Sequence, residues 1–383
     1  MKEDQPVIAS RRAVALPHIT MYPKFHKPKM SQRFLISYSN CFIKPLCKVV
    51  SLALSSVYNS IASHCKMLYT VTGIKHNYTI LNNEDILNCV KDVNENSLAR
   101  NIETFDFSTL YTKLSHDDIK TAITFAINLA FNRNKYKPYL SVYNSSAAWV
   151  KKPRTTTVHF TSSNLIKCVC FIIDNSYFIL GELVFRQLIG IPIGVDPGPF
   201  IANLTLWYFE FIYISKLYKV DYASALKLNR TFRLIDDITS INSDGLFQAH
   251  CPKIYPASLS LNKENSVDTK ANVLDLSLEI NAENKFEVGV FDKRDLFKFN
   301  VIRFSPRCSN MPERMGYNIF SLQILRFSRI CNNFDNLKTR VLNLFDICIS
   351  LGYAKSKLVS AYNKLIRNHR LAIKFPDVSK ILQ

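Results

Sequence analysis

Two neighbouring acids in an apolar setting are the residues of this sequence best suited to chemistry. Asp236 and Asp237 lie between Leu234-Ile235 and Ile238. Two adjacent carboxylates are costly to bury, because like charges repel and both lose hydration. Side chains alternate between the faces of a strand, but a tight turn between two strands would bring both acids to one edge. A divalent cation there would offset their charge; the alternative is an ordinary Asp-Asp turn on the surface.

A third acid, Asp106, favours the metal-binding interpretation. It lies inside an apolar segment that we predict to be a strand over residues 102–111. If this strand and the segment at 232–238 lie side by side, three carboxylates meet at one edge of a sheet. Such ligands suit Mg²⁺, which proteins usually hold with one or two carboxylates plus substrate phosphates. Two such metals can activate a 3′-hydroxyl and stabilise leaving pyrophosphate. This is polymerase chemistry, although a nuclease could use the same trio.

The distribution of charge points to a polyanionic partner. The formal net charge of the 383 residues is +19. Residues 1–50 carry nine Lys and Arg against two Asp and Glu, and residues 291–383 carry seventeen against six. Two basic ends around a nearly neutral middle suit a groove that holds nucleic acid between two lobes. A merely basic protein would also carry such a surplus.

The elements that must position these acids follow from apolar spacing and capping residues. Helices are predicted from about Cys47 to Cys65, after Ser115, from about Pro199 to Leu217, and within residues 317–371. Residues 132–162 are predicted to lie at the surface, residues 167–188 to form strands with a hairpin near Asp174, and residues 254–300 to form strands and turns.

The apolar segments and the cysteine pattern indicate the cellular compartment of the protein. The apolar run at 199–214 contains Asn203 and Glu210 and is shorter than a bilayer span, so we predict a buried helix and no membrane partner. No signal peptide is visible. The ten cysteines show no C-x-x-C pair and no zinc-finger spacing, which predicts reduced thiols in an intracellular protein.

Five sequence blocks, in order, resemble motifs of reverse transcriptases, in the form found in Penelope-like retroelements. Residues 105–112 (FDFSTLYT) are similar to the first palm motif, and residues 187–194 (QLIGIPIG) to the glycine–proline motif. Residues 235–237 (IDD) resemble the double-aspartate motif. Residues 273–280 with 291–294 look like the downstream palm segment, and residues 23–27 with 32–34 like the finger region. The resemblance covers roughly residues 20–370.

The resemblance implies an α+β right-hand polymerase with fingers, a palm built on an antiparallel sheet, and a helical thumb. Residues 1–100 would be a truncated fingers-like region, and residues 101–290 the palm, with inserted finger elements near 132–190. Residues 291–383 would complete the palm and form the thumb on the duplex. The GIY-YIG endonuclease of many Penelope-like proteins is not visible in the sequence.

The resemblance also implies roles at the catalytic centre. Asp106 and Asp236 would hold two Mg²⁺ ions, for which Mn²⁺ can substitute, and Asp237 would act as a ligand or as electrostatic support. Tyr111 would lie under the incoming sugar and exclude a 2′-hydroxyl; the alternative is a core aromatic. Lys293 would donate a proton to pyrophosphate or contact the primer, unless it is only a solvated neighbour of Arg294.

Further residues would bind the nucleotide. Arg33 would contact the triphosphate, unless it is one more basic surface residue. Gln187, Gly190, Pro192 and Gly194 form the glycine–proline motif, whose glycines would let the backbone approach the nascent base pair. Asp196 departs from the motif and would add negative charge near the template phosphates.

The activity implied is that of an RNA-directed DNA polymerase, with an RNA template, a DNA primer and dNTPs as partners and nuclear residence. The alternative is a truncated, catalytically inactive protein that binds nucleic acid through its basic ends.

Overall fold

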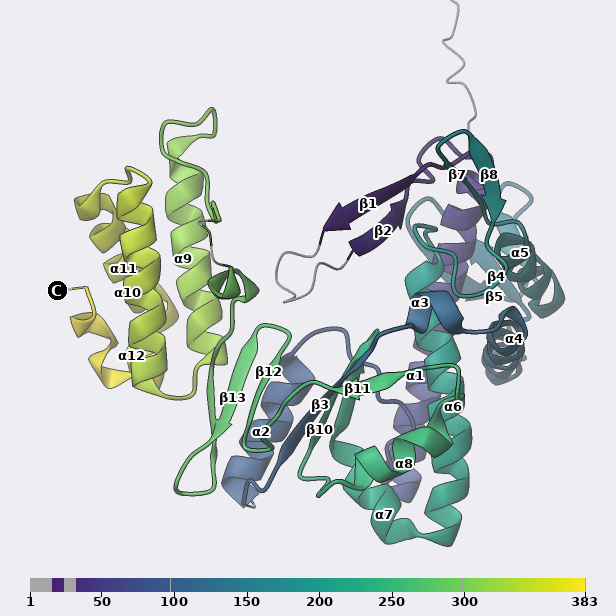
Figure 1. Ribbon diagram of the computed structural model, residues 1–383, viewed down its shortest axis with the longest axis horizontal. Coiled ribbons are helices and arrows are strands. Elements are labelled where there is room, and N and C mark those ends of the chain that lie inside the picture. The colour runs from purple at the N-terminus through teal and green to yellow at the C-terminus, as the bar shows by residue number, and fades with distance from the viewer. Residues whose placement is uncertain (1–15, 24–31, 97, 298, 300, 383) are drawn as a thin grey trace, which may run out of the picture. The chain divides into compact units, whose positions relative to one another are not determined.

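The computed structural model describes residues 16–23, 32–96, 98–297, 299 and 301–382. The chain divides into two compact units, and segments of the two units alternate along the sequence (Figure 1). The first unit comprises residues 1–79, 106–229 and 246–262, and the second comprises residues 80–105, 230–245 and 263–383.

A bundle of helices forms the core of the first unit. Helix α1 (Lys44–Thr72) packs against α4 (His116–Arg133) and α6 (Gly198–Val220), as the apolar spacing predicted. Among the described helices, α1 alone is long and apolar enough to cross a membrane, but eight of its residues are buried within the protein, as in a core helix. Shorter helices complete the unit: α3 (Leu110–Lys113), α7 (Tyr222–Lys227), η1 (Leu228–Arg230) and α8 (Leu246–Ile254).

Helix α4 begins where its capping residue predicted. The Ser115 hydroxyl accepts a hydrogen bond from the Asp118 N–H at 3.0 Å, which satisfies one of the free amides of the first turn. Asp117 and Asp118 add negative charge at the positive end of the helix.

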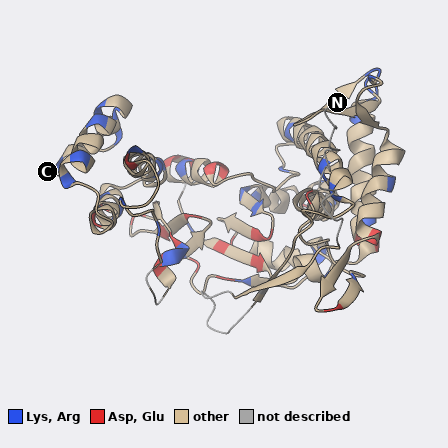
Figure 2. Ribbon diagram, turned by 90° about the horizontal axis from the view of Figure 1, so that it is seen from above, with Lys and Arg blue, Asp and Glu red and all other residues tan. Residues whose placement is uncertain are grey.

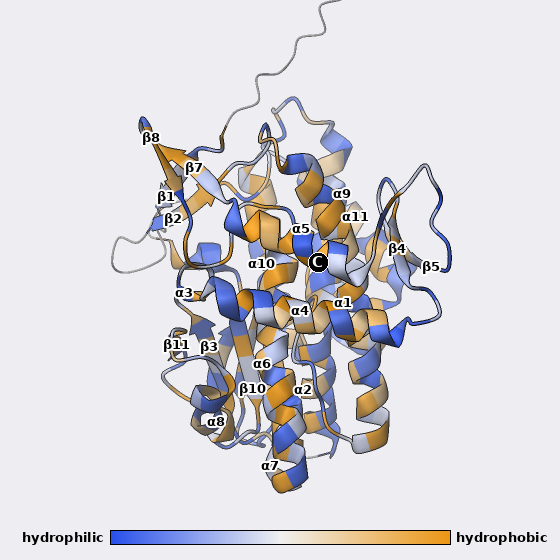
Figure 3. Cartoon of the chain, turned by 90° about the vertical axis from the view of Figure 1, so that its right-hand side faces the viewer, coloured by the Kyte–Doolittle hydropathy of each residue, from blue (hydrophilic) through white to orange (hydrophobic). Residues whose placement is uncertain are grey.

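The strand prediction for residues 167–188 was wrong in its first half. Residues 162–174 form helix α5 (Ser162–Asp174), capped by Thr161, and its buried residues Leu165, Val169 and Ile172 recur at helical spacing. The hairpin follows instead at β7 (Tyr177–Leu180) and β8 (Leu183–Arg186), with its turn at Gly181 rather than near Asp174. The hydrophobic hairpin is clearly visible in Figure 3. A short run of alternating residues cannot by itself separate a helix from a strand.

Small antiparallel sheets complete the first unit. Strands β1 (Ile19–Pro23) and β2 (Gln32–Ile36) pair, while the predicted finger residues 24–27 lie outside the described residues. The polar segment 132–162 contains strands β4 (Tyr139–Val142), β5 (Ala147–Val150) and β6 (Val158–Phe160), which form a sheet of order β5-β4-β6.

The second unit combines strands with a helical C-terminal part. Residues 254–300 contain β11 (Leu261–Lys263), which the boundary between the units crosses. They also contain β12 (Lys270–Val273), β13 (Leu276–Ile280), β14 (Phe286–Val290) and η2 (Lys293–Leu296), which confirms the prediction of strands and turns. Helices α9 (Glu313–Ile330), α10 (Phe334–Ser350) and α11 (Lys355–His369) confirm the helical prediction. They are followed by α12 (Leu371–Lys374) and η3 (Pro376–Lys380), and α2 (Glu84–Asn96) precedes them in the chain.

Mixed helices and small antiparallel sheets confirm the α+β part of the predicted class. A four-stranded sheet of order β11-β3-β10-β9 carries the residues of most interest. The boundary between the units passes through its strand β3 (Ile102–Phe107), just before Asp106. The three regions predicted from the resemblance remain a prediction.

Candidate active site

The two adjacent acids lie at a tight hairpin. Strands β9 (Thr231–Leu234) and β10 (Asp237–Ile241) are antiparallel, and Leu234 lies opposite Asp237, so that Ile235 and Asp236 form a two-residue turn. The segment 232–238 is therefore two strands rather than the one we predicted. Both acids are half-buried.

The turn holds a strained residue. Ile235 has a φ of +55°, a region in which a β-branched side chain is an outlier and for which such turns usually select Gly or Asn. Strain of this kind costs on the order of 1–3 kcal/mol and is concentrated at functional sites. The hairpin thus keeps a costly conformation where it displays two carboxylates.

Sequence reasoning missed a residue beneath this turn. The Arg233 side chain is fully buried, and its Nη1 donates a hydrogen bond to the Ile235 carbonyl at 3.2 Å. A buried guanidinium beside the turn supplies positive charge where two carboxylates are held. The signal in the sequence was a cation inside an apolar strand, a position that Arg rarely takes without a partner.

The third acid belongs to the strand next to this hairpin. In the sheet, β3 is the neighbour of β10. The Asn242 N–H donates to the Asn101 carbonyl at 2.9 Å, and Asn101 directly precedes β3 whereas Asn242 directly follows β10. Because this hydrogen bond joins the start of β3 to the end of β10, the two strands can pair along their length only if they run antiparallel. The predicted strand 102–111 ends at Phe107, because Leu110 begins helix α3.

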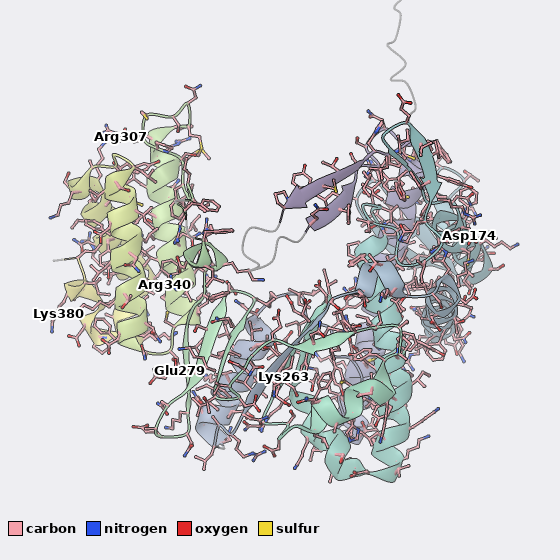
Figure 4. All side chains as sticks on the ribbon, viewed as in Figure 1. Asp174, Lys263, Glu279, Arg307, Arg340 and Lys380 are labelled. Carbon is pink, nitrogen blue, oxygen red and sulfur yellow. The ribbon has the colours of Figure 1, made fainter. Side chains whose placement is uncertain are left out.

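Buried polar contacts hold β3 in the sheet. Glu103 is almost fully buried and accepts hydrogen bonds from the Ser243 hydroxyl at 2.8 Å and from Lys263 Nζ at 3.1 Å. Lys263 also pairs with Asp268 at 2.7 Å, and Figure 4 labels this lysine. A buried carboxylate with both oxygens satisfied fixes the strand without leaving an unpaired charge.

The three predicted acids carry carboxylates, which are of the ligand type that magnesium binds. Asp106, Asp236 and Asp237 are half-buried carboxylates, and Mg²⁺ takes oxygen ligands while retaining water or phosphate oxygens. Within the described residues, no group of three or more His, Cys, Asp or Glu is gathered closely enough to hold a metal ion by itself.

The glycine–proline motif lies against the segment that follows Asp106. Gly190 has a φ of +88°, and a β-carbon there would overlap the carbonyl group of Tyr111. Its N–H donates to the Leu114 carbonyl at 2.7 Å. The structure therefore brings Tyr111 and Gly190 together, and the protein backbone by itself requires a glycine at position 190.

A histidine strengthens this contact. Burial lowers the pKa of His116, which keeps its ring neutral near pH 7. The ring lies 3.1 Å from the Gly190 carbonyl through Nε2, which must be the donor because a carbonyl oxygen only accepts. Within the motif, the Gln187 amide donates to the Ile189 and Ile191 carbonyls at 3.0 and 3.1 Å, so its described hydrogen bonds close the turn.

Gly194 connects the same motif to the predicted finger strand. It has a φ of +89°, and a β-carbon there would overlap the carbonyl of Ile36, the last residue of β2. Arg33 belongs to β2 and lies opposite Tyr22, but its side chain is outside the described residues. Pro192 is buried between the two glycines. Three of the sequence blocks therefore meet in the first unit.

Asp196 was expected to add negative charge near the template phosphates, but its carboxylate is paired with a cation. Its Oδ1 lies 2.8 Å from Lys44 Nζ, and the two side chains are 28% and 25% exposed. The Ser51 hydroxyl also donates to the Asp196 carbonyl at 3.2 Å. The departure from the family motif is thus matched by a cation on α1.

Lys293 lies in a separate setting. It begins η2, is exposed, and lines a pocket of the second unit together with four arginines. Lys and Arg also recur along the C-terminal helices, as the blue bands in Figure 2 show. The sequence block that contains Lys293 is therefore part of a basic surface.

Comparison with known proteins bears on the fold. No protein-family model matches the sequence, and no curated protein matches it. Among solved structures, telomerase from Candida albicans, in complex with a fragment of telomeric RNA, superimposes with a TM-score of 0.61 at 11% identity, covering 95% of this chain and 61% of that chain. The chain has a reverse-transcriptase-like polymerase fold.

Other polymerases match more distantly. Apo telomerase from Candida tropicalis gives a TM-score of 0.49 at 12% identity over 96% of this chain and 63% of that chain. A Sicinivirus RNA-dependent RNA polymerase gives 0.39 at 7% identity over 74% and 53%. The chain spans about three fifths of the length of the telomerase chains it matches. The predicted fold is supported by the Candida albicans telomerase match, and the Penelope-like assignment stays a prediction.

Proposed function

We propose that this chain is the core of an RNA-directed DNA polymerase of the Penelope-like type, which extends a DNA primer with dNTPs on an RNA template. The observation that carries the proposal is that β3, which contains Asp106, lies next to β10, which begins at Asp237, in one sheet. Counting from the Asn101–Asn242 hydrogen bond, Asp106 and Asp237 are each five residues away along antiparallel strands. This count supports one catalytic centre at the end of the sheet, next to the strained turn that displays Asp236.

In this mechanism each residue has a defined task. Asp106 and Asp236 would hold two Mg²⁺ ions, or Mn²⁺, and Asp237 would add a ligand or negative charge beside them. Bound ions of this kind supply charge stabilisation to the transferring phosphoryl group and lower the pKa of the primer 3′-hydroxyl. Buried Arg233 holds the turn, so that the carboxylates need not reorganise during the reaction.

Primer extension tests the proposal. The chain is incubated with an oligo(dT) primer on poly(rA), dTTP and Mg²⁺, with parallel reactions on poly(dA) and in EDTA. We expect extension on the RNA template that EDTA abolishes. Tight binding of the primer–template without any extension in Mg²⁺ or Mn²⁺ would contradict a polymerase and favour the inactive binding protein.

Tyr111 is expected to set the choice of sugar. Replacing Tyr111 with Val should raise rUTP incorporation relative to dTTP by roughly tenfold to a hundredfold, because a steric pocket discriminates by about 1–3 kcal/mol. Its carbonyl contact with Gly190 is made by backbone and survives the change. The measurement is kcat/KM for each nucleotide.

A matched control is available in the same unit. Tyr136 is 76% exposed, and Tyr136→Val should leave sugar selection unchanged. Equal rUTP-to-dTTP ratios in wild type and Tyr111→Val would show that Tyr111 is a core aromatic without a role at the sugar.

A further inference from the structure

A basic pocket in the second unit lies away from the aspartate hairpin in sequence. It has a volume of about 220 Å³ and is bounded by the β12–β13 turn, η2, α9 and α10. Five cations line it: Lys293, Arg294, Arg303, Arg326 and Arg340. Figure 4 labels Arg340 on α10.

Three carboxylates share these cations. Asp292 pairs with Arg294 at 2.8 Å and with Arg303 at 3.4 Å, and Asp295 pairs with Arg303 and, at 2.8 Å, with Arg340. Asp275 pairs with Arg326 at 2.6 Å. Five cations against three carboxylates leave a surplus of two positive charges. Although burial opposes it, hydrogen bonds from Arg294 lower the pKa of Asp292, so the carboxylate stays ionised at neutral pH.

An ion-pair network that served only to hold a loop in place would need neither the two excess positive charges nor a pocket between them. Lys293 makes no ion pair with any described residue, and it is an exposed residue of the pocket lining. Guanidinium groups present donors in a planar fork that matches phosphate oxygens. Phe291 and Phe304 add an apolar wall on which a sugar can rest.

The size of the pocket limits the ligand. At about 220 Å³ it is smaller than the roughly 300 Å³ at which pockets for drug-sized ligands begin. One phosphate with its sugar fits such a volume, whereas a complete nucleoside triphosphate would not be enclosed.

We propose that this pocket, whose lining includes none of the three aspartates, binds a single nucleotide phosphate with its sugar through Arg303, Arg340 and Lys293. The choice of a nucleotide as ligand rests on the proposed polymerase function. A phosphate with its sugar could come from two sources, a free mononucleotide or one backbone unit of a bound nucleic-acid strand.

Arg303 is the residue to test, because each carboxylate that it pairs with keeps another ion-pair partner when Arg303 is replaced. In Arg303→Gln, Asp292 keeps Arg294 and Asp295 keeps Arg340. The matched control is Arg307→Gln: Arg307 pairs with Glu313, which keeps Lys357, and it is not among the residues that line the pocket. The two variants lose the same charge, and Figure 4 labels Arg307.

Binding of dTMP is measured by calorimetry and binding of (dT)12 by fluorescence anisotropy, on the full chain in EDTA so that no turnover occurs. We expect Arg303→Gln to weaken binding by about tenfold, as for loss of one charge-assisted hydrogen bond. A loss for both probes identifies a mononucleotide site, and a loss for (dT)12 alone identifies a strand contact. In the latter case the slope of log K against log salt also falls by roughly 0.7.

Equal affinities of wild type, Arg303→Gln and Arg307→Gln for both probes would overturn the proposal, as would equal losses in the two variants. Because the measurement needs no metal and no catalysis, such a result leaves the primer-extension test untouched. Failure of extension with intact Arg303-dependent binding would instead count against the polymerase and not against the pocket.

Discussion

Replacing Asp236 with asparagine is expected to lower dNTP incorporation by about a thousandfold, since losing a metal-binding charge removes about 4 kcal/mol of transition-state stabilisation. Binding of the primer–template should change little, because phosphate contacts elsewhere on a basic protein dominate affinity. The folded protein should be no less stable, since the change relieves repulsion between adjacent carboxylates. Asp106→Asn should have the same effect on incorporation.

Asp346→Asn provides the control, because Asp346 is an exposed acid of α10 and undergoes the same chemical change. Rates are compared at saturating primer–template in Mg²⁺. Incorporation by Asp236→Asn within a few-fold of the Asp346→Asn rate would remove Asp236 from the mechanism.

The second large effect concerns folding. Gly194→Ala should lower the free energy of unfolding of the first unit by at least about 3 kcal/mol. Alanine in the left-handed region costs roughly 1–2 kcal/mol, and overlap with the Ile36 carbonyl forces the backbone to move. Both tryptophans of the chain, Trp149 and Trp207, belong to the first unit, so their fluorescence in a urea titration reports on this unit.

Gly181 offers a control with the same backbone conformation and none of the overlap. Its φ is +64°, and nothing lies within 4 Å of a β-carbon placed there. Gly181→Ala should therefore cost only the conformational strain, roughly 1–2 kcal/mol. Equal losses in Gly181→Ala and Gly194→Ala would mean that the contact with β2 is not rigid.

The sequence supplied the candidate acids and some of the local structure around them. Residue types alone singled out Asp106, Asp236 and Asp237, because carboxylates inside apolar strands are unusual. The capped start of α4 at Ser115 and the C-terminal helices were also predictable, since capping and apolar periodicity act locally.

Contacts between distant segments could not be predicted in this way. The glycines at 190 and 194 were expected to make room for a ligand, yet the space beside each is filled by the backbone of Tyr111 and of Ile36. The burial of Arg233 and the pairing of Asp196 with Lys44 likewise depend on tertiary packing. The strand prediction for residues 167–174 was wrong for another reason, because a short apolar run is compatible with both a helix and a strand.

The proposed function depends on one metal centre built from acids that lie 130 residues apart, at 106 and 236. Affinity cleavage tests this centre: Fe²⁺ takes the place of Mg²⁺ and, with added hydrogen peroxide and ascorbate, generates hydroxyl radicals that cut the nearby backbone. We expect paired cuts next to Asp106 and next to Asp236-Asp237, which excess Mg²⁺ and Asp236→Asn both suppress. Cuts at one of these positions without the other, or cuts that Asp236→Asn leaves unchanged, would contradict this proposal.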